Sequence, residues 1–287
     1  MRKSAKNIMV SINDITVSYN DTGPVDSPVI VFIHGFPLNK SMWDKQTAAL
    51  KDNYRVIAYD IRGHGNSDAG IGDFRIELFV NDLIRLMDTL KIDKAVICGL
   101  SMGGYIALAA MEEYPERFEA LVLCDTQCIA DTPEAKEKRL KTIEHINEIG
   151  VENYAEESVK NLFAPGSFTT KQEEIAEVKE MIINTSKQSL FSTLMALAER
   201  KETCSKLQDI NVPVLIMVGK GDKITPPSAA RLMQRKIQNS SLHILDHAGH
   251  VANLENPYEF NYQLKNFLQE QIKKTFELPS GSSFESK

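Results

Sequence analysis

The sequence predicts an α/β fold, in which a mostly parallel central sheet is covered by helices on both faces. Short apolar runs alternate with helical patterns along most of the chain, and this alternation is typical of parallel sheets. It stops after Asp125 and resumes at Val214, which indicates an inserted helical unit. We therefore expect a core of residues 1–126 and 202–275, a helical cap of residues 127–201, and a disordered tail of residues 276–287.

The first half of the core begins with a predicted hairpin, residues 7–12 and 15–20, which turns at Asn13-Asp14. Continuous apolar runs are typical of buried strands, because both faces of a parallel sheet are covered. Such runs occupy residues 29–33, 54–59, 95–98 and 120–124. Helices are expected at residues 40–50, at residues 74–90, where apolar residues recur at helical spacing, and at residues 105–111.

The inserted segment is charge-rich, contains no strand-like run and predicts helices at residues 134–149 and 173–184. The core then continues with a strand at residues 214–218. A helix over residues 226–238 has a good start signal, since Thr225 can cap it and Pro226 suits its first turn. A strand at residues 242–245 and an amphipathic helix from 257 to about 277 complete the core.

Composition excludes several classes of function. The chain has 287 residues, of which 43% are hydrophobic and 25% charged, the profile of an ordinary globular protein. Its net charge of -6 offers no basic surface for nucleic acid. No apolar run approaches the roughly 20 residues that span a membrane. The basic first seven residues lead into polar ones, unlike a signal peptide.

The four cysteines form no C-x-x-C pair and no metal-ligand cluster with histidine. Cys98 and Cys124 fall inside predicted core strands, where a thiol behaves as a small apolar group. We expect these two, and also Cys128 and Cys204, to be reduced, which favours a cytoplasmic location.

The most informative motif is G-x-S-x-G at residues 99–103. It lies between the apolar run of residues 95–98 and the helical run of residues 105–111. A tight strand-to-helix turn places the central side chain in a cleft and requires small flanking residues. Ser101 is therefore a candidate nucleophile.

A serine hydroxyl becomes an effective nucleophile when a base, usually histidine, takes its proton. Four of the six histidines are expected to be structural or solvent-exposed: His34 and His64 in loops, His243 in a strand, and His145 in the cap. His247 and His250 follow the last predicted strand, at the edge where open α/β sheets carry their sites. His250 is the preferred base, because Gly249 gives its loop the freedom to turn the ring inward.

The acid that orients this histidine is expected at the same edge of the sheet. Asp222 follows the strand of residues 214–218 and is preferred, because Thr225 is expected to cap the next helix and to leave Asp222 free. Asp125 is a competitor, since it ends the strand beside that of the nucleophile. Asp246 is a weaker candidate, because it adjoins His247 and is expected at the surface.

With its strained nucleophile turn and the chain order Ser101, Asp222, His250, the sequence resembles the α/β-hydrolase fold family. The resemblance covers about residues 8–125 and 202–275, and not the cap. Its motifs are HGFP at 34–37, DIRGHGNS at 60–67, GLSMGG at 99–104, Gly221-Asp222 and Gly249-His250.

An oxyanion hole is the second requirement, because two backbone N–H groups must stabilise the negative oxygen of a tetrahedral intermediate. Met102 begins a helix, where N–H donors are free and the helix dipole is favourable. The family resemblance implies that Phe36 is the second donor, and Pro37 cannot donate. The expected mechanism has Ser101 as nucleophile and His250 as base, and it requires no metal or organic cofactor.

Within the family, residues 41–44 (SMWD), the turn around Arg62 and residues 99–104 resemble carboxylesterases, 3-oxoadipate enol-lactonases and cofactor-free haloperoxidases. Phe36-Pro37 resembles the haloperoxidase or perhydrolase group. Epoxide hydrolases and haloalkane dehalogenases use an aspartate nucleophile, so Ser101 argues against both. We expect hydrolysis of small-molecule carboxylic esters; lactone hydrolysis, perhydrolysis and a non-catalytic ligand-binding receptor are alternatives, and the oligomeric state is left open.

Overall fold

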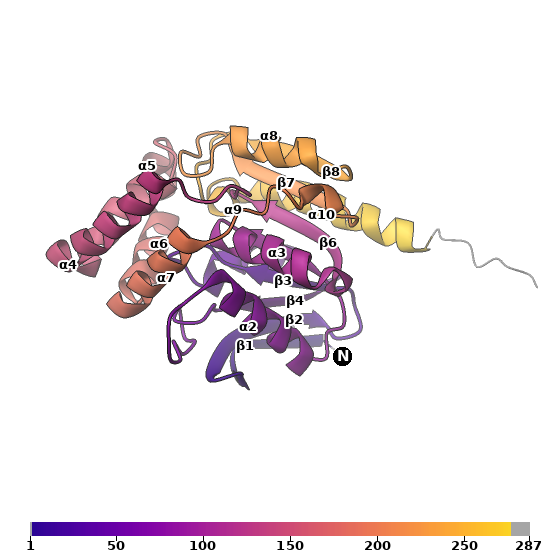
Figure 1. Cartoon of the computed structure of the whole chain (residues 1–287). Helices are drawn as coiled ribbons and strands as arrows, with labels where there is room; N and C mark the ends of the chain where they lie inside the picture. The colour runs from indigo at the N-terminus through magenta and orange to yellow at the C-terminus, as the bar shows by residue number, and fades with distance from the viewer. Residues whose placement is uncertain (1, 277–287) are drawn as a thin grey trace, which may run out of the picture.

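An eight-stranded sheet in the order β1-β2-β4-β3-β5-β6-β7-β8 forms the centre of the fold (Figure 1). The computed structural model describes residues 2–276. The predicted tail lies outside these residues, except for Phe276, which ends the last helix. The strands are β1 (Arg2–Ile12), β2 (Ile15–Pro24), β3 (Val29–Ile33), β4 (Arg55–Tyr59), β5 (Ala95–Leu100), β6 (Phe118–Cys124), β7 (Val214–Gly219) and β8 (Ser240–Leu245).

The sheet is antiparallel at one edge and parallel elsewhere. β1 and β2 form the predicted hairpin and β2 pairs antiparallel with β4, whereas the pairs from β4 through β8 are all parallel. Parallel strands need crossover connections, which the helices supply. The carboxyl ends of β5, β7 and β8 therefore reach the same edge of the sheet, which is where the candidate residues were expected.

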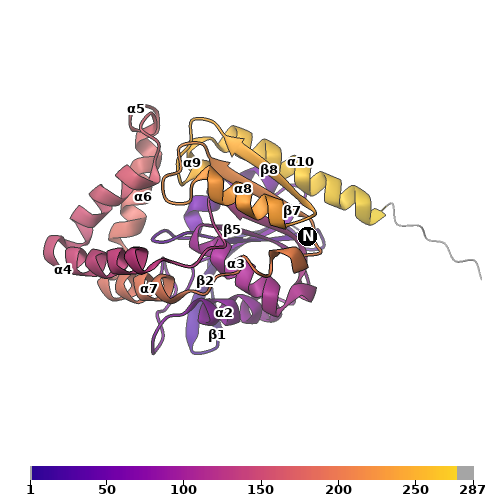
Figure 2. The ribbon, with the colours of Figure 1, turned by 45° about the horizontal axis from the view of Figure 1, so that its top comes forward.

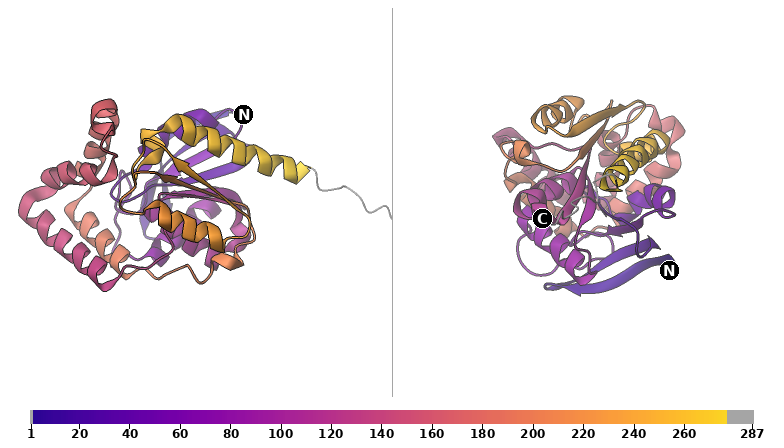
Figure 3. Two further views of the ribbon diagram at one scale, coloured as in Figure 1. Left: turned by 90° about the horizontal axis from the view of Figure 1, so that it is seen from above. Right: turned by 90° about the vertical axis from the view of Figure 1, so that its right-hand side faces the viewer.

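Helices cover both faces of the sheet, which confirms the predicted fold class (Figure 3). α2 (Ile76–Thr89), α3 (Met102–Glu113) and α8 (Pro227–Lys236) pack on one face. The short helix η1 (Lys40–Trp43) with α1 (Asp44–Leu50), α9 (Ala252–Glu255) and α10 (Pro257–Phe276) pack on the other. Two further short helices are η2 (Pro115–Arg117) and η3 (Leu207–Asp209). None of the helices within residues 2–276 combines the length and apolar composition that crossing a bilayer requires.

Four helices between β6 and β7 stand together at one side of the sheet, and we call them the cap (Figure 2). They are α4 (Pro133–Leu162), α5 (Ser167–Thr170), α6 (Gln172–Ile183) and α7 (Lys187–Glu199). The sequence pattern predicted a shorter α4 and missed α7. α4 continues past a break at Gly150, whose φ of 83° only glycine adopts easily. α7 buries polar Ser189 and Thr193 beside its leucines, so its apolar spacing is hidden.

The expectation of four reduced cysteines is wrong for two of them. Cys128 and Cys204 form a disulfide across 76 residues of sequence, while Cys98 and Cys124 are free and buried. A pairing at such separation leaves no local spacing signal, because the fold alone brings the two sulfurs together. Because two of the cysteines are bonded to each other, the argument from reduced thiols no longer supports a cytoplasmic location.

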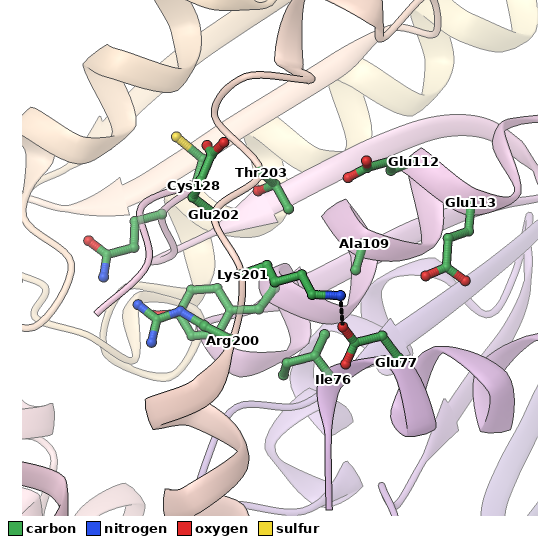
Figure 4. A pocket seen from close by; sticks show the side chains of 12 residues that line it. Ile76, Glu77, Ala109, Glu112, Glu113, Cys128, Arg200, Lys201, Glu202 and Thr203 are labelled. Carbon is green, nitrogen blue, oxygen red and sulfur yellow. Dashed lines mark ion pairs between the residues drawn. The ribbon is translucent and has the colours of Figure 1, made fainter. Parts of the chain in front are cut away.

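The disulfide joins the two segments that connect the cap to the core, residues 125–132 and 200–213, which we call the cap base. The Thr203 N–H also donates to the Cys128 carbonyl at 2.9 Å. A pocket of about 170 Å³ lies there, and Figure 4 shows Lys201 reaching across it to Glu77 at 3.0 Å. This pocket is lined by the cap base, α2 and α3 and does not include Ser101.

Candidate active site

Ser101 occupies a strained turn between β5 and α3, as the motif predicted. Its φ of 54° and ψ of -113° lie outside the regions that non-glycine residues favour. The flanking positions must be glycine, because a side chain at either would clash with neighbouring backbone. A Cβ on Gly99 would lie 2.2 Å from the Gly103 carbonyl oxygen, and one on Gly103 would lie 2.3 Å from the Ile33 carbonyl oxygen. Thr126 supports the turn by donating its hydroxyl to the Ser101 carbonyl at 2.8 Å.

Ser101, His250 and Asp222 meet at the carboxyl edge of the sheet. The Ser101 hydroxyl donates to His250 Nε2 at 2.8 Å. The other ring nitrogen, Nδ1, donates to Asp222 Oδ2 at 2.9 Å. All three residues are at least nine-tenths buried. This arrangement gives the hydroxyl a base within reach and fixes the tautomer of that base.

Asp222 is held by its own loop as well as by the histidine. Oδ1 accepts from the N–H groups of Ile224 and Thr225 at 2.8 and 3.0 Å, and Oδ2 accepts from the Thr225 hydroxyl at 2.7 Å. Burial raises the pKa of Asp222, but the adjacent His250 and these hydrogen bonds outweigh it, so the pKa lies below its usual value. The carboxylate form is favoured.

The expectation that Thr225 caps the next helix and leaves Asp222 free is wrong. Thr225 does not cap α8; the cap position is Pro226, and Thr225 instead binds Asp222. Asp222 therefore accepts hydrogen bonds from the backbone of its own loop, in an Asx turn, and contacts His250 at the same time. The two roles are compatible because a carboxylate has about four acceptor positions.

Asp125, the competing acid, does not reach the histidine. Its Oδ1 accepts from the Gly219 N–H at 2.8 Å, which ties the end of β6 to the end of β7. Burial, followed by the nearby Asp222 carboxylate, raises the pKa of Asp125 well above its usual range. Asp246, the weaker candidate, is exposed and pairs with Lys220 at 2.7 Å.

His34 and His64 brace loops, as expected for them. His34 Nε2 accepts from the Ile61 N–H at 2.9 Å, and its Nδ1 donates to the Gly35 carbonyl at 2.9 Å. His64 Nδ1 donates to the Arg62 carbonyl at 3.0 Å. Burial lowers the pKa of His64 to about 4, so this ring is neutral near pH 7.

The loop that carries Phe36 lies directly beside the nucleophile. A Cβ on Gly35 would lie 3.3 Å from the Ser101 Cβ, so only glycine lets the loop approach this closely. Met102 is the first residue of α3, and the first N–H groups of a helix have no intrahelical acceptor. The side chain of Phe36 packs against an apolar cap cluster of Ile146, Leu190 and Leu194.

Sequence analysis assigned no role at this site to three residues that hold it together: Thr126, Thr225 and Glu255. Thr126 and Thr225 bind Ser101 and Asp222, as described above. Glu255 binds the N–H of Gly249, immediately before His250, at 2.6 Å. The only sequence signal is proximity to the motif residues, which many polar residues share.

Comparison with known proteins decides the family. Residues 28–257 match the family model described as the alpha/beta hydrolase fold. The chain belongs to this family. A 3-oxoadipate enol-lactonase of Acinetobacter baylyi is 31% identical over 256 residues, which cover 89% of this chain and 94% of the relative.

Two further α/β hydrolases extend the comparison. A protein named putative non-heme chloroperoxidase, from a Synechocystis species, is 32% identical over 276 residues, covering 89% of this chain and 95% of the relative. The solved structure of a thermophilic esterase from Thermogutta terrifontis has a TM-score of 0.86 and 32% identity, and the match covers 94% of this chain and 99% of that structure. The similarity spans core and cap alike.

Proposed function

We propose that this protein is a serine hydrolase that cleaves carboxylic esters of small molecules through an acyl-enzyme on Ser101. The observation that carries the proposal is the continuous hydrogen-bonded chain from Ser101 through His250 to Asp222, at 2.8 and 2.9 Å. Relatives named esterase and enol-lactonase support it, since both names describe cleavage of an ester linkage.

In the acylation step, Ser101 Oγ attacks the ester carbonyl while its proton passes to His250 Nε2. The new C–O bond forms as the carbonyl π electrons move onto oxygen. The N–H groups of Phe36 and Met102 stabilise that oxygen, and one such donor is typically worth about 10²–10³ in rate. Asp222 stabilises the imidazolium that forms. The tetrahedral species then collapses, and His250 returns the proton to the departing alcohol.

In the deacylation step, water takes the place of the alcohol. His250 removes a proton from the water as its oxygen attacks the acyl carbonyl. Collapse of the second tetrahedral species releases the carboxylic acid, and the proton on His250 returns to Ser101 Oγ. The same three side chains therefore serve both halves of the reaction.

Turnover of short p-nitrophenyl esters, with labelling by a fluorophosphonate probe, tests the proposal. The wild type should hydrolyse the ester and bind the probe at Ser101. Ser101→Ala should abolish both, whereas Ser205→Ala, which changes an exposed serine at the cap base, should alter neither. Unchanged hydrolysis in Ser101→Ala would refute the assignment. An inert Ser101 in the wild type would favour a ligand-binding receptor.

Lactone hydrolysis is the second candidate, supported by the relative named 3-oxoadipate enol-lactonase. A lactone would open by the same attack, with the leaving alcohol still attached to the acyl group. The values of kcat/KM on matched lactones and linear esters decide between the two. Perhydrolysis is a third candidate, supported by the relative named chloroperoxidase and by Phe36-Pro37. It would appear as peracid and water formed from acetic acid and hydrogen peroxide.

A further inference from the structure

Glu255, the last residue of α9, is a buried carboxylate close to the site. Its Oε1 accepts from the Gly249 N–H at 2.6 Å. Its Oε2 accepts from the Ala164 N–H at 2.7 Å and from the Ser167 hydroxyl at 2.5 Å. One carboxylate therefore joins the loop of the candidate base to the cap segment that follows α4.

Burying a carboxylate costs free energy unless hydrogen bonds compensate, so the partners of Glu255 indicate what holds it in place. Burial raises the pKa of Glu255, and the hydrogen bonds from Ser167, Ala164 and Gly249 oppose that rise. All three partners are donors, so the arrangement requires an acceptor at both carboxylate oxygens. A neutral apolar residue of similar size would leave two buried N–H groups without a partner.

The loop of the base also touches the cap directly. The His250 N–H donates to the Leu162 carbonyl, at the end of α4, at 2.7 Å. Gly249 packs so closely that a Cβ on it would lie 2.7 Å from the Ala164 nitrogen. The backbone on the amino side of the His250 Cα is thereby fixed by the cap, while the His250 ring is fixed by Ser101 and Asp222.

We infer that Glu255 is a positioning residue, which holds the backbone of His250 against the end of α4 and so sets the distance between the imidazole and Ser101. This inference rests on the proposed function, since it assigns a role in the same reaction. Glu255 does not touch Ser101 Oγ; it acts through the Gly249 N–H and through the cap. Glu255 therefore affects the chemical step rather than substrate binding.

Glu255→Gln breaks this link between the loop of the base and the cap. The Gly249 and Ala164 N–H groups can only donate and they face different side-chain oxygens, so in either orientation of the glutamine amide its nitrogen opposes one of them. The loop of the base is then no longer held against the cap and should relax. Misplacing a catalytic group by about 1 Å can cost about 100-fold, so we expect kcat to fall about 10- to 100-fold with KM nearly unchanged.

Two matched variants test whether this effect is specific. Ser167→Ala removes one donor on the cap side and leaves the Gly249 contact, so its kcat should stay near that of the wild type. Asp21→Asn changes a buried carboxylate of β2 that binds the Arg55 guanidinium at 2.9 Å; Arg55 begins β4, at the edge of the sheet opposite the candidate site. It should lower the melting temperature without lowering kcat when assayed below that temperature.

The experiment measures kcat, KM and the rate of fluorophosphonate labelling on the full chain, together with the melting temperature. A wild type without ester hydrolysis or labelling would remove the proposed function itself. An active wild type with an equally active Glu255→Gln would overturn the positioning role alone. Losses of kcat in Glu255→Gln and Asp21→Asn that track melting temperature would also overturn it, by showing a purely structural effect.

If Glu255→Gln does not fold, Glu255→Asp provides the second measurement. The shorter carboxylate keeps its charge and cannot span both the Gly249 and the Ala164 donors. We expect a lower kcat and slower labelling, with KM unchanged. A Glu255→Asp enzyme with wild-type kcat would contradict the inference, because the span of the side chain would then not matter.

Discussion

Replacing Asp222 by asparagine tests the most specific claim about the site, that this carboxylate and not Asp125 orients the base. The two acids end neighbouring strands, and both are buried. Only Asp222 contacts His250, at 2.9 Å from Nδ1. In Asp222→Asn the loop contact to Thr225 can persist through the amide oxygen, so the fold should remain while the hydrogen bond to the ring changes.

The expected loss is large because an amide nitrogen at this position cannot accept from Nδ1–H. The ring would take the tautomer that places its proton on Nε2, and Nε2 could then no longer accept from the Ser101 hydroxyl. Loss of the orienting aspartate in a serine triad costs about 10⁴-fold in kcat. This factor corresponds to about 5.5 kcal/mol of transition-state stabilisation.

Asp125→Asn is the matched control. Its Oδ1 accepts only from the Gly219 N–H, and an amide oxygen can do the same. The raised pKa of Asp125 favours the neutral acid, which an amide resembles. We expect kcat within about threefold of the wild type.

Both variants are assayed on p-nitrophenyl acetate, with burst kinetics to isolate acylation and near-ultraviolet circular dichroism to check folding. A folded Asp222→Asn that retains a tenth of the wild-type kcat would refute the role of Asp222. So would an Asp125→Asn enzyme that loses as much activity as Asp222→Asn.

Three further predictions concern stability. Reducing the Cys128–Cys204 disulfide should lower the free energy of unfolding by up to about 4.5 kcal/mol, because the bond closes a loop of 76 residues. Urea unfolding with and without a phosphine reductant measures this change. The stability of a Cys128→Ser, Cys204→Ser double variant should not respond to the reductant. The pKa of His64 is lowered from 6.5 to about 4, so between these values the unfolded chain binds a proton that the folded chain does not. The free energy of unfolding should therefore fall by about 2 kcal/mol from pH 7 to pH 5, and less in His64→Gln. Gly103→Ala would place its Cβ 2.3 Å from the Ile33 carbonyl oxygen and should cost about 3 kcal/mol, whereas Gly166→Ala has open space and should leave the melting temperature unchanged.

The core could be predicted because its sequence signals are local. Strands such as Val29–Ile33 are short apolar runs with clear ends, and the turn at Ser101 is marked by glycines on either side. The cap was predicted less well. α7 buries polar residues and α4 continues beyond Gly150, so neither follows a simple amphipathic pattern. Their helical state depends on packing, which local periodicity does not record.

The candidate site likewise contains residues that local motifs mark and contacts that only the fold creates. Ser101, Asp222 and His250 each adjoin a glycine motif, so their positions were visible, and chain order suggested that they converge. The supporting contacts were not visible. Glu255 meets Ala164 only in the fold, 91 residues away in sequence. Cys128 and Cys204 are likewise paired by the connection between cap and core.

The cap is attached to the core at both ends of α4, and the two attachments differ in kind. Before its start, the disulfide closes the cap base, whose pocket does not include Ser101. At its end, the Leu162 carbonyl and the Glu255 carboxylate bind the backbone of His250 and Gly249. Between them the cap cluster around Leu190 packs on Phe36. Changes in that cluster should therefore affect how a substrate fits, whereas changes at the end of α4 should affect how fast it reacts.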